Sequence, residues 1–287
     1  MIRLVASDMD GTLLNRYGKI SLKNQAAVHA LNRRNIDFVV CTGRNYADAY
    51  APLKEAGISC DIICMNGAAV FNTKGEQIRK QTLLKSQISR ILTICRPFCV
   101  LYDFMTDEGS YTTSSLEEFK ESFENKIFLS MVSEEHTFET IVKRFQFISE
   151  EHLFHSETDI YKMSVVHEDP QVLAHIRSCL EKEEEGLSIA SSAATNLEIT
   201  HFNAQKGNAL LEYAINTKIH PREILAMGDS ENDLSMLILP LGYTVAMDNG
   251  SEIIKKSARL VTRSNEEDGV AAAIETLVLS DAALATG

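Results

Sequence analysis

Ile2-Arg-Leu-Val-Ala-Ser-Asp8-Met-Asp10-Gly-Thr-Leu-Leu14 is the stretch that decides the fold, because a short apolar run stops abruptly at two aspartates. The apolar part favours a buried strand, and the helix and strand signals that follow alternate regularly. Strands separated by helices of this length predict βαβ units and a parallel sheet. The elements expected here are Ile2–Ala6, Ser21–Arg34, Ile36–Cys41, Tyr46–Ala56 and Asp61–Met65, with Ser21 as the helix N-cap.

The same rhythm returns at the other end of the sequence, where three apolar runs again alternate with helical segments. We expect strands at Ile224–Met227, Tyr243–Met247 and Arg259–Thr262. Helices are expected at Gly207–Thr217, Asn232–Leu239, Ile253–Ser257 and Gly269–Leu279, followed by a frayed tail from Asp281.

The middle of the chain lacks this regularity and mixes amphipathic helices with short strands. Helices are expected at Ser86–Cys95, Leu116–Asn125, Thr137–Glu150 and Pro170–Glu184, and strands at Val100–Asp103, Asp159–Val166 and Ser188–Ser191. The predicted fold class is therefore α/β, a Rossmann-like doubly wound parallel sheet core with an inserted α+β cap domain. The predicted ranges are 1–83 and 191–287 for the core and 84–190 for the cap.

Composition narrows the class of protein. A length of 287 residues suits about two domains, and 45% hydrophobic with 24% charged residues is typical of a packed globular chain. The net charge of −12 argues against nucleic acid as a partner. No apolar stretch is long enough for a membrane helix and no signal peptide is seen, so we expect a cytoplasmic protein without a membrane partner. The six cysteines are expected to be reduced, partly buried thiols.

Polar residues follow the predicted strands where each one ends. They are Asp8 and Asp10, then Thr42-Gly43-Arg44, then Gly228-Asp229-Ser-Glu-Asn232-Asp233. Open parallel sheets bind ligands at the carboxyl ends of their strands, so these segments are expected to meet although they lie far apart in sequence. Close carboxylates repel one another unless a cation lies between them, and an all-oxygen cluster suits Mg²⁺ beside a substrate phosphate.

Each signal has a plainer interpretation when it is taken alone. An Asp-x-Asp pair is often a turn or a cap, and Thr42-Gly43 after a strand is often a helix cap. Lys206-Gly207 at the start of a helix is often a solvated lysine. The aromatic side chains Phe145 and Phe147 are expected to be core residues rather than a stacking platform. The two carboxylate clusters together favour the functional interpretation.

Taken together, the motifs resemble those of the haloacid dehalogenase superfamily of hydrolases, and in detail its Cof-type subfamily, subclass IIB, which has a large α/β cap. The matching segments are Asp8–Leu14, Thr42–Arg44, Asn66-Gly67, Lys206-Gly207, Gly228–Met236, Ala246-Met247 and Asn265–Gly269. The sequence departs from the family pattern at Asp248-Asn249-Gly250, a loop near the fourth motif.

The resemblance implies a role for each matching residue. Asp8 is expected to be the nucleophile, and Asp10 the general acid and then the base. Mg²⁺ is expected to be held by Asp8, the backbone carbonyl of Asp10 and Asp229, with support from Asp233. Phosphoryl binding is assigned to Thr42, Gly43, Arg44, Lys206 and Asn232, with Thr42 and Lys206 also counted as catalytic.

The function implied is a Mg²⁺-dependent phosphatase that hydrolyses phosphate monoesters of small metabolites through an aspartyl-phosphate. Sugar phosphates are expected first, and cofactors such as pyridoxal phosphate or flavin mononucleotide next. An acidic residue at Asp10 fits an alkoxide leaving group. Two alternatives stay open, a phosphosugar mutase of the same fold and a catalytically silent metabolite-binding protein. The protein is expected to be a monomer or a homodimer.

Overall fold

The computed structural model describes residues 1–124, 137–183 and 185–280, and the chain divides into two compact units. The first unit is made of residues 1–79 together with the segment from 205 onward, and the second of residues 80–204. The chain returns to the first unit between residues 204 and 205. Strand β11 (Asn196–His201) belongs to the second unit because it pairs there with β9 (Lys162–Val166) and β10 (Leu187–Ala190). The domain ranges 1–83, 84–190 and 191–287 remain a prediction.

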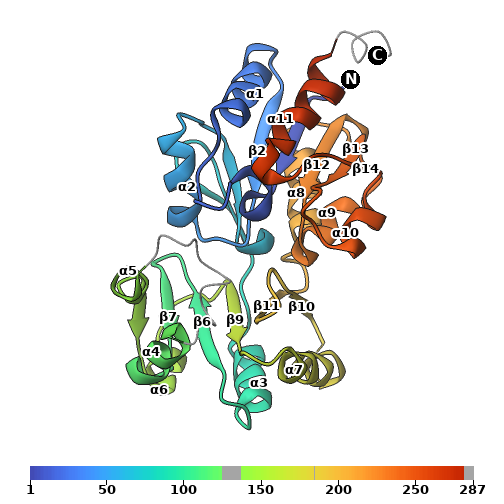
Figure 1. The fold of residues 1–287 in the computed structure, drawn as a ribbon. Coiled ribbons are helices and arrows are strands. Elements are labelled where there is room, and N and C mark those ends of the chain that lie inside the picture. Colours follow the sequence, from blue (N-terminus) through green and yellow to red (C-terminus); the bar gives the residue numbers. More distant parts are fainter. Residues whose placement is uncertain (125–136, 184, 281–287) are drawn as a thin grey trace. The chain divides into compact units, whose positions relative to one another are not determined.

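The first unit is built on an eight-stranded sheet in the order β14-β13-β12-β1-β2-β3-β4-β5 (Figure 1). Every pair from β14 to β3 is parallel, and β4 turns back antiparallel to β3. The strands are β1 Leu4–Ser7, β2 Asp37–Cys41, β3 Asp61–Cys64, β4 Ala69–Phe71, β5 Gln77–Lys80, β12 Ile224–Gly228, β13 Tyr243–Ala246 and β14 Leu260–Val261. Strand order reverses at β1, whose neighbours β12 and β2 come from opposite ends of the sequence.

Helices cover this sheet and bury its apolar side chains. The helices of the first unit are α1 Leu22–Arg33, α2 Tyr46–Glu55, α8 Lys206–Asn216, α9 Leu234–Leu237, α10 Glu252–Ser257 and α11 Gly269–Ile274. Leu4, Val39 and Ile63 of the sheet share one buried cluster with residues of α8, α9 and α10. Helix α1 packs against α11, and the Asn24 side chain joins them by accepting from the backbone N–H of Ala271 at 3.0 Å.

The expected α/β core is confirmed, with helix and strand ends shifted by a few residues. Ser21 caps α1 as predicted, because its side chain accepts from the backbone N–H of Asn24 at 3.1 Å. The predicted helix Asn232–Leu239 is shorter, since residues 231–233 form a separate turn before α9. The tail from Asp281, expected to fray, lies outside the described residues.

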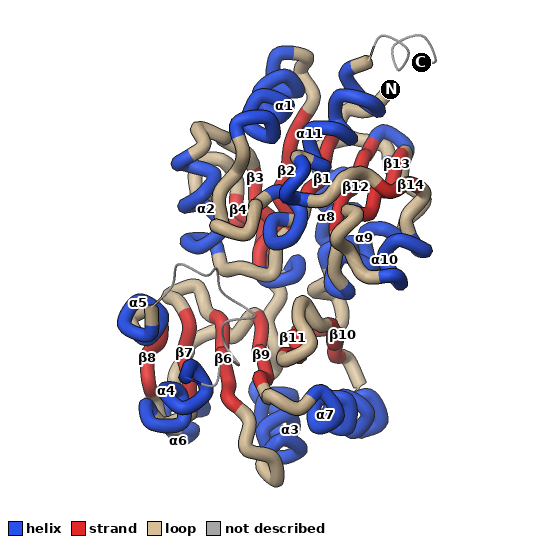
Figure 2. The backbone as a smooth tube through the Cα atoms, in the orientation of Figure 1, coloured by secondary structure: helices blue, strands red, loops and turns tan. Residues whose placement is uncertain are grey.

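The second unit holds a six-stranded sheet in the order β10-β11-β9-β6-β7-β8 (Figure 2). Neighbouring strands of this sheet are antiparallel, except that β7 and β8 are parallel. The other elements are α3 Lys85–Cys95, β6 Leu101–Met105, β7 Ser110–Thr112, α4 Leu116–Glu124, α5 Phe138–Val142, β8 Phe145–Phe147, α6 Glu150–His155, β9 Lys162–Val166, α7 Pro170–Glu183 and β10 Leu187–Ala190. Residues of α3 and α7 form one apolar core with β6, β9 and β11.

One predicted helix of this unit, Thr137–Glu150, is wrong. The helix ends at Val142, and Phe145–Phe147 is a strand that pairs with β7. The reason is tertiary, because the rings of Phe145 and Phe147 lie 4.8 and 5.6 Å from the ring of Phe119, centroid to centroid. Phe145 packs against the buried cluster around Phe119, which agrees with a core role, whereas Phe147 is 37% exposed, so the expected core role is wrong for that ring. The longest described helix, α7, has 14 residues, and no described helix has the length and apolar character of a membrane span.

Candidate active site

The predicted site residues follow the carboxyl ends of neighbouring strands in the first unit. Ser7 of β1 is in register with Met227 of β12 on one side and Val40 of β2 on the other. The residues that continue each strand therefore emerge at one edge of the sheet, where strand order reverses. This register brings the start of the sequence beside the segment around Asp229.

Three aspartates form the centre of this edge. Carboxylate oxygens of Asp8, Asp229 and Asp233 all lie within 4.8 Å of one another. Asp8 is 4% exposed and Asp233 is fully buried. Asp233 is fixed by the turn it belongs to, because its Oδ2 accepts from the backbone N–H groups of Asp229 at 2.9 Å and Ser230 at 3.0 Å. The cluster is thus built partly by local backbone geometry and partly by the sheet.

Lys206 supplies the positive charge within this cluster. Its Nζ donates to Oδ1 of Asp8 at 2.6 Å and to Oδ1 of Asp233 at 2.7 Å, and its side chain is fully buried. Lys206 is the first residue of α8, and the next residue lets that helix approach α9 closely. A Cβ on Gly207 would lie 2.1 Å from the backbone oxygen of Ser235, so a side chain there would push the lysine away. The solvated-lysine interpretation is wrong.

Burial and mutual repulsion shift the pKa values of these groups. Burial, reinforced by the charge of Asp233, raises the pKa of Asp8 well above its ordinary value although Lys206 opposes the shift. The pKa of Asp229 rises to about 6, mainly through burial and again through Asp233. Burial alone would lower the pKa of Lys206, but the charges of Asp233 and Asp8 outweigh it and raise that pKa. Each shift reflects negative charge that is crowded and poorly hydrated.

The donor set fits a divalent cation. Three ionised carboxylates and one ammonium leave two negative charges in a buried cluster, and the raised pKa values of Asp8 and Asp229 show that this excess is not offset within the protein. Carboxylate oxygens at this spacing are hard ligands of the type Mg²⁺ prefers. The residues present therefore fit Mg²⁺, and its binding to this protein stays a prediction.

Gly11 packs directly against the carboxylate of Asp229. It has a φ of +74°, and a Cβ there would lie 2.4 Å from Oδ2 of Asp229. Thr12 holds the same aspartate by donating from Oγ1 to its Oδ1 at 2.9 Å. The turn after β1 thus both carries Asp8 and sets the position of a carboxylate more than two hundred residues away.

Asp10 forms an ion pair with Arg44 and is not one of the three clustered aspartates. Nε and Nη2 of Arg44 donate to the two oxygens of Asp10, at 2.8 and 2.6 Å. The structure therefore brings the predicted acid and a predicted phosphoryl-binding residue together. Thr42 and Gly43 lie in the turn that leads to Arg44, and the Thr42 hydroxyl accepts from the backbone N–H of Arg44 at 3.1 Å.

Asn232 lies in the turn before α9, on the predicted site segment. Its Nδ2 donates to Oδ1 of Asn66, the second residue after β3, at 3.3 Å. Asn66 adopts a left-handed backbone conformation with a φ of +57°. Two of the predicted motifs are thus joined by one side-chain hydrogen bond.

Two residues that the sequence pattern does not single out contribute to the site. Thr12 lies within the first motif, and Asn249 lies in the loop Asp248-Asn249-Gly250, which departs from the family pattern. In the structure, Nδ2 of Asn249 donates to the backbone oxygen of Gly11 at 2.8 Å, and its Oδ1 accepts from the backbone N–H of Asn265 at 3.0 Å. The loop therefore ties the turn after β1 to the last motif, which no spacing rule predicts.

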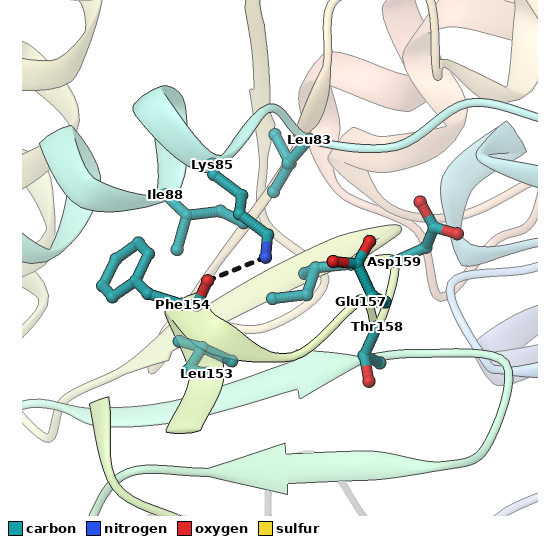
Figure 3. A pocket seen from close by; sticks show the side chains of 9 residues that line it. Leu83, Lys85, Ile88, Leu153, Phe154, Glu157, Thr158 and Asp159 are labelled. Atoms are coloured by element: carbon teal, nitrogen blue, oxygen red, sulfur yellow. Dashed lines mark hydrogen bonds between the residues drawn. The ribbon is translucent and has the colours of Figure 1, made fainter. Parts of the chain in front are cut away.

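A separate pocket lies wholly within the second unit (Figure 3). Its walls are Leu83, Lys85, Ile88, Leu153, Phe154, Glu157, Thr158, Asp159 and Ile160. Lys85 points to the carboxyl end of α6, where its Nζ donates to the backbone oxygen of Phe154 at 2.8 Å and to that of Ser156. This lysine satisfies carbonyl groups at the end of α6, so the structure assigns it a helix-capping role.

Comparison with known proteins extends over nearly the whole chain. A family model described as haloacid dehalogenase-like hydrolase matches residues 5–274. Phosphatase YwpJ of Bacillus subtilis is 31% identical over 285 residues, which cover 94% of this chain and 98% of the relative. The 5-amino-6-(5-phospho-D-ribitylamino)uracil phosphatase YwtE of the same organism is 31% identical over 288 residues, which cover 96% of this chain and 98% of the relative.

A solved structure has the same architecture. It is that of a haloacid dehalogenase-like hydrolase from B. subtilis, and it superimposes with a TM-score of 0.85 at 31% identity. The match covers 96% of this chain and 100% of the other. Both units of the fold are therefore present in the relative.

Proposed function

The chain belongs to the haloacid dehalogenase-like hydrolases and is a phosphoric monoester hydrolase, and we propose that it is a Mg²⁺-dependent phosphatase that works through an aspartyl-phosphate. Membership confirms the family resemblance predicted from the sequence. The observation that carries the proposal is the cluster of Asp8, Asp229, Asp233 and Lys206 at the carboxyl edge of the sheet.

Asp8 is the proposed nucleophile. A carboxylate oxygen of Asp8 attacks phosphorus and displaces the alcohol, so one difficult displacement is divided into two. The attack needs an ionised carboxylate, which burial disfavours and the ammonium of Lys206 at 2.6 Å favours. Lys206 is thereby placed to keep Asp8 ionised and to offset negative charge on the phosphoryl oxygens.

Asp10 is the proposed general acid and base. Its carboxyl proton passes to the leaving oxygen as the phosphorus–oxygen bond breaks, and the resulting carboxylate then takes a proton from the attacking water. Its side chain is 58% exposed, in contrast to the buried Asp8. A solvent-accessible carboxyl group suits repeated proton exchange, and a buried one suits nucleophilic attack in a site that excludes water.

The carboxylates of Asp8, Asp229 and Asp233 and the backbone carbonyl of Asp10 are the proposed ligands of Mg²⁺. When bound, Mg²⁺ offsets the charge of both the carboxylates and the phosphoryl group, which otherwise repel each other. Thr42, Gly43, Lys206 and Asn232 are proposed to hold the phosphoryl oxygens through hydroxyl, amide and ammonium donors. Asn232 reaches this role from the turn where it now donates to Asn66.

The proposed substrates are small phosphorylated metabolites with an alcohol leaving group, sugar and polyol phosphates before phosphorylated cofactors. The printed name of the relative YwtE describes a phosphate on a ribityl chain, which supports a polyol phosphate as the first compound to test. We propose no nucleic acid or membrane partner, a cytoplasmic location, and a monomer or homodimer in solution.

The proposal is tested with a panel of sugar, polyol and cofactor phosphates, with Mg²⁺ and with excess chelator. Phosphate release is expected only with Mg²⁺, and Asp8→Asn is expected to abolish it. Asp107→Asn, at an exposed aspartate of the second unit, is the matched control and should keep wild-type turnover. Covalent labelling completes the test, since acid quenching during turnover should trap phosphate on wild-type protein and none on Asp8→Asn. Metal-independent turnover, or turnover by Asp8→Asn, would overturn the mechanism.

A further inference from the structure

The side chain of Asp10 is held by a two-pronged ion pair. Nε of Arg44 donates to its Oδ2 at 2.8 Å and Nη2 donates to its Oδ1 at 2.6 Å. Parallel hydrogen bonds of this kind between a guanidinium and a carboxylate fix orientation as well as distance. Within the described part of the chain, Arg44 makes every hydrogen bond that the Asp10 carboxylate accepts.

Arg44 is the anchored member of the pair. Its backbone N–H donates to Oγ1 of Thr42 at 3.1 Å, and its backbone oxygen accepts from the N–H of Met65 at 2.9 Å. Its Nη1 donates to the backbone oxygen of Asp48 at 3.2 Å, at the start of α2. The arginine side chain is 28% exposed, whereas that of Asp10 is 58% exposed. The arginine is therefore tied to β2, β3 and α2, and the aspartate takes its orientation from it.

The local backbone gives Asp10 no comparable restraint. Asp10 has φ −75° and ψ 124°, an extended conformation within the turn after β1, and Gly11 follows at φ +74°. An exposed aspartate in such a turn samples several side-chain rotamers, and only one of them keeps its oxygens in a given proton-transfer position. A fixed guanidinium that binds both oxygens selects one rotamer.

We propose that Arg44 is a positioning residue for Asp10, an inference that rests on the phosphatase mechanism proposed above. It sets the orientation from which the Asp10 carboxyl group gives its proton to the leaving oxygen and later takes one from water. This assignment differs from the sequence-based expectation that Arg44 binds the phosphoryl group. The two roles predict different effects of the leaving group on the rate. Loss of proton transfer slows the reaction most when the leaving oxygen is strongly basic, whereas loss of phosphoryl binding slows it equally for every leaving group.

The test compares kcat/KM for two leaving groups in Arg44→Gln. For an alkyl phosphate such as glycerol phosphate, whose oxygen must be protonated as it departs, we expect a loss of about 100-fold. For p-nitrophenyl phosphate, which leaves as a stable anion, we expect a loss below about 5-fold. Asp10→Asn should show the same selectivity. Arg44→Lys keeps the positive charge but cannot donate two parallel hydrogen bonds to the carboxylate, so it should resemble Arg44→Gln.

A double-mutant cycle separates positioning from substrate binding. If Arg44 acts through Asp10, adding Arg44→Gln to Asp10→Asn should change kcat/KM by less than about 2-fold for either substrate. Multiplied losses in the double variant, or equal losses for both leaving groups, would overturn the proposal and make Arg44 a phosphoryl-binding residue. Arg3→Ala, which removes a surface ion pair to Glu223, is the matched control and should behave as wild type. Absence of Mg²⁺-dependent hydrolysis in the wild type would instead overturn the proposed function, and this inference with it.

Discussion

Nζ of Lys206 lies 2.6 Å from Oδ1 of Asp8, although the two residues are 198 positions apart and both are buried. The same ammonium lies 2.7 Å from Oδ1 of Asp233. One lysine thus offsets two buried carboxylates, and the third, Asp229, leaves the cluster with excess negative charge. This excess of negative charge would favour a bound cation, as the proposed metal site requires.

Removing the lysine should cost more stability than an ordinary surface change. Lys206→Met keeps the apolar stem but leaves Asp8 and Asp233 buried without a partner charge. We expect the free energy of unfolding to fall by about 3–5 kcal/mol. Chemical denaturation without metal measures it, with Lys54→Met at an exposed lysine of α2 as the control. Adding Asp8→Asn should restore part of the loss, and an equally unstable double variant would contradict a charge-based cause.

Asp229 should make the metal-free protein less stable as pH rises. Its pKa is about 6 in the folded state and near 3.8 when unfolded, so the folded protein holds the proton more tightly. The associated stability is present below pH 3.8 and is lost as pH rises through 6. Asp229→Asn removes this dependence and should be more stable than wild type at pH 8 without metal, by on the order of 2 kcal/mol.

The order should reverse when Mg²⁺ is added at pH 8. Wild type is expected to bind the ion with its full set of carboxylates and to gain stability by linkage, whereas Asp229→Asn would lack a proposed ligand and should gain little. Thermal denaturation with and without Mg²⁺, beside Asp107→Asn as the control, measures both effects. An equal gain from Mg²⁺ in wild type and Asp229→Asn would remove Asp229 from the proposed ligand set.

Much of the candidate site could be predicted because strand ends carry it. Asp8 and Asp229 follow apolar runs that register places side by side, so local pattern and sheet geometry lead to the same edge. The partners of Arg44 and Asn249 could not be predicted, since their side chains reach across turns whose shape depends on the whole unit. The predicted helix over residues 137–150 failed for a similar reason, because pairing with β7 overrides its helical periodicity.

The thiols should differ sharply in reactivity. Burial raises the pKa of Cys60 and Cys95 to about 12 and also raises that of Cys41 and Cys64, so little thiolate forms at neutral pH. Cys99 is exposed and should react first with a disulfide reagent. Titration before and after denaturation, with mass mapping of the labelled residue, tests this. All six thiols should react after unfolding, and fast native labelling of Cys64 would contradict the described packing.

A pair of glycines offers a controlled test of how the turn after β1 shapes the metal site. Gly11 and Gly57 have similar positive φ values, +74° and +65°, so alanine pays the same backbone strain of about 1–2 kcal/mol at each. Around Gly57 nothing lies within 4 Å of an added Cβ, whereas at Gly11 the Cβ would lie 2.4 Å from Oδ2 of Asp229. The difference between the two variants therefore reports displacement of Asp229 alone.

We expect Gly57→Ala to lose stability but keep the wild-type Mg²⁺ affinity. Gly11→Ala should lose more stability and bind Mg²⁺ at least about 10-fold more weakly, since moving one carboxylate out of the ligand set costs more than 1.4 kcal/mol. Calorimetric titration of the metal measures the affinity directly and needs no substrate. Equal Mg²⁺ affinity in the two variants would show that the Asp229 carboxylate can shift without loss, and that the close approach of Gly11 does not set the geometry of the site.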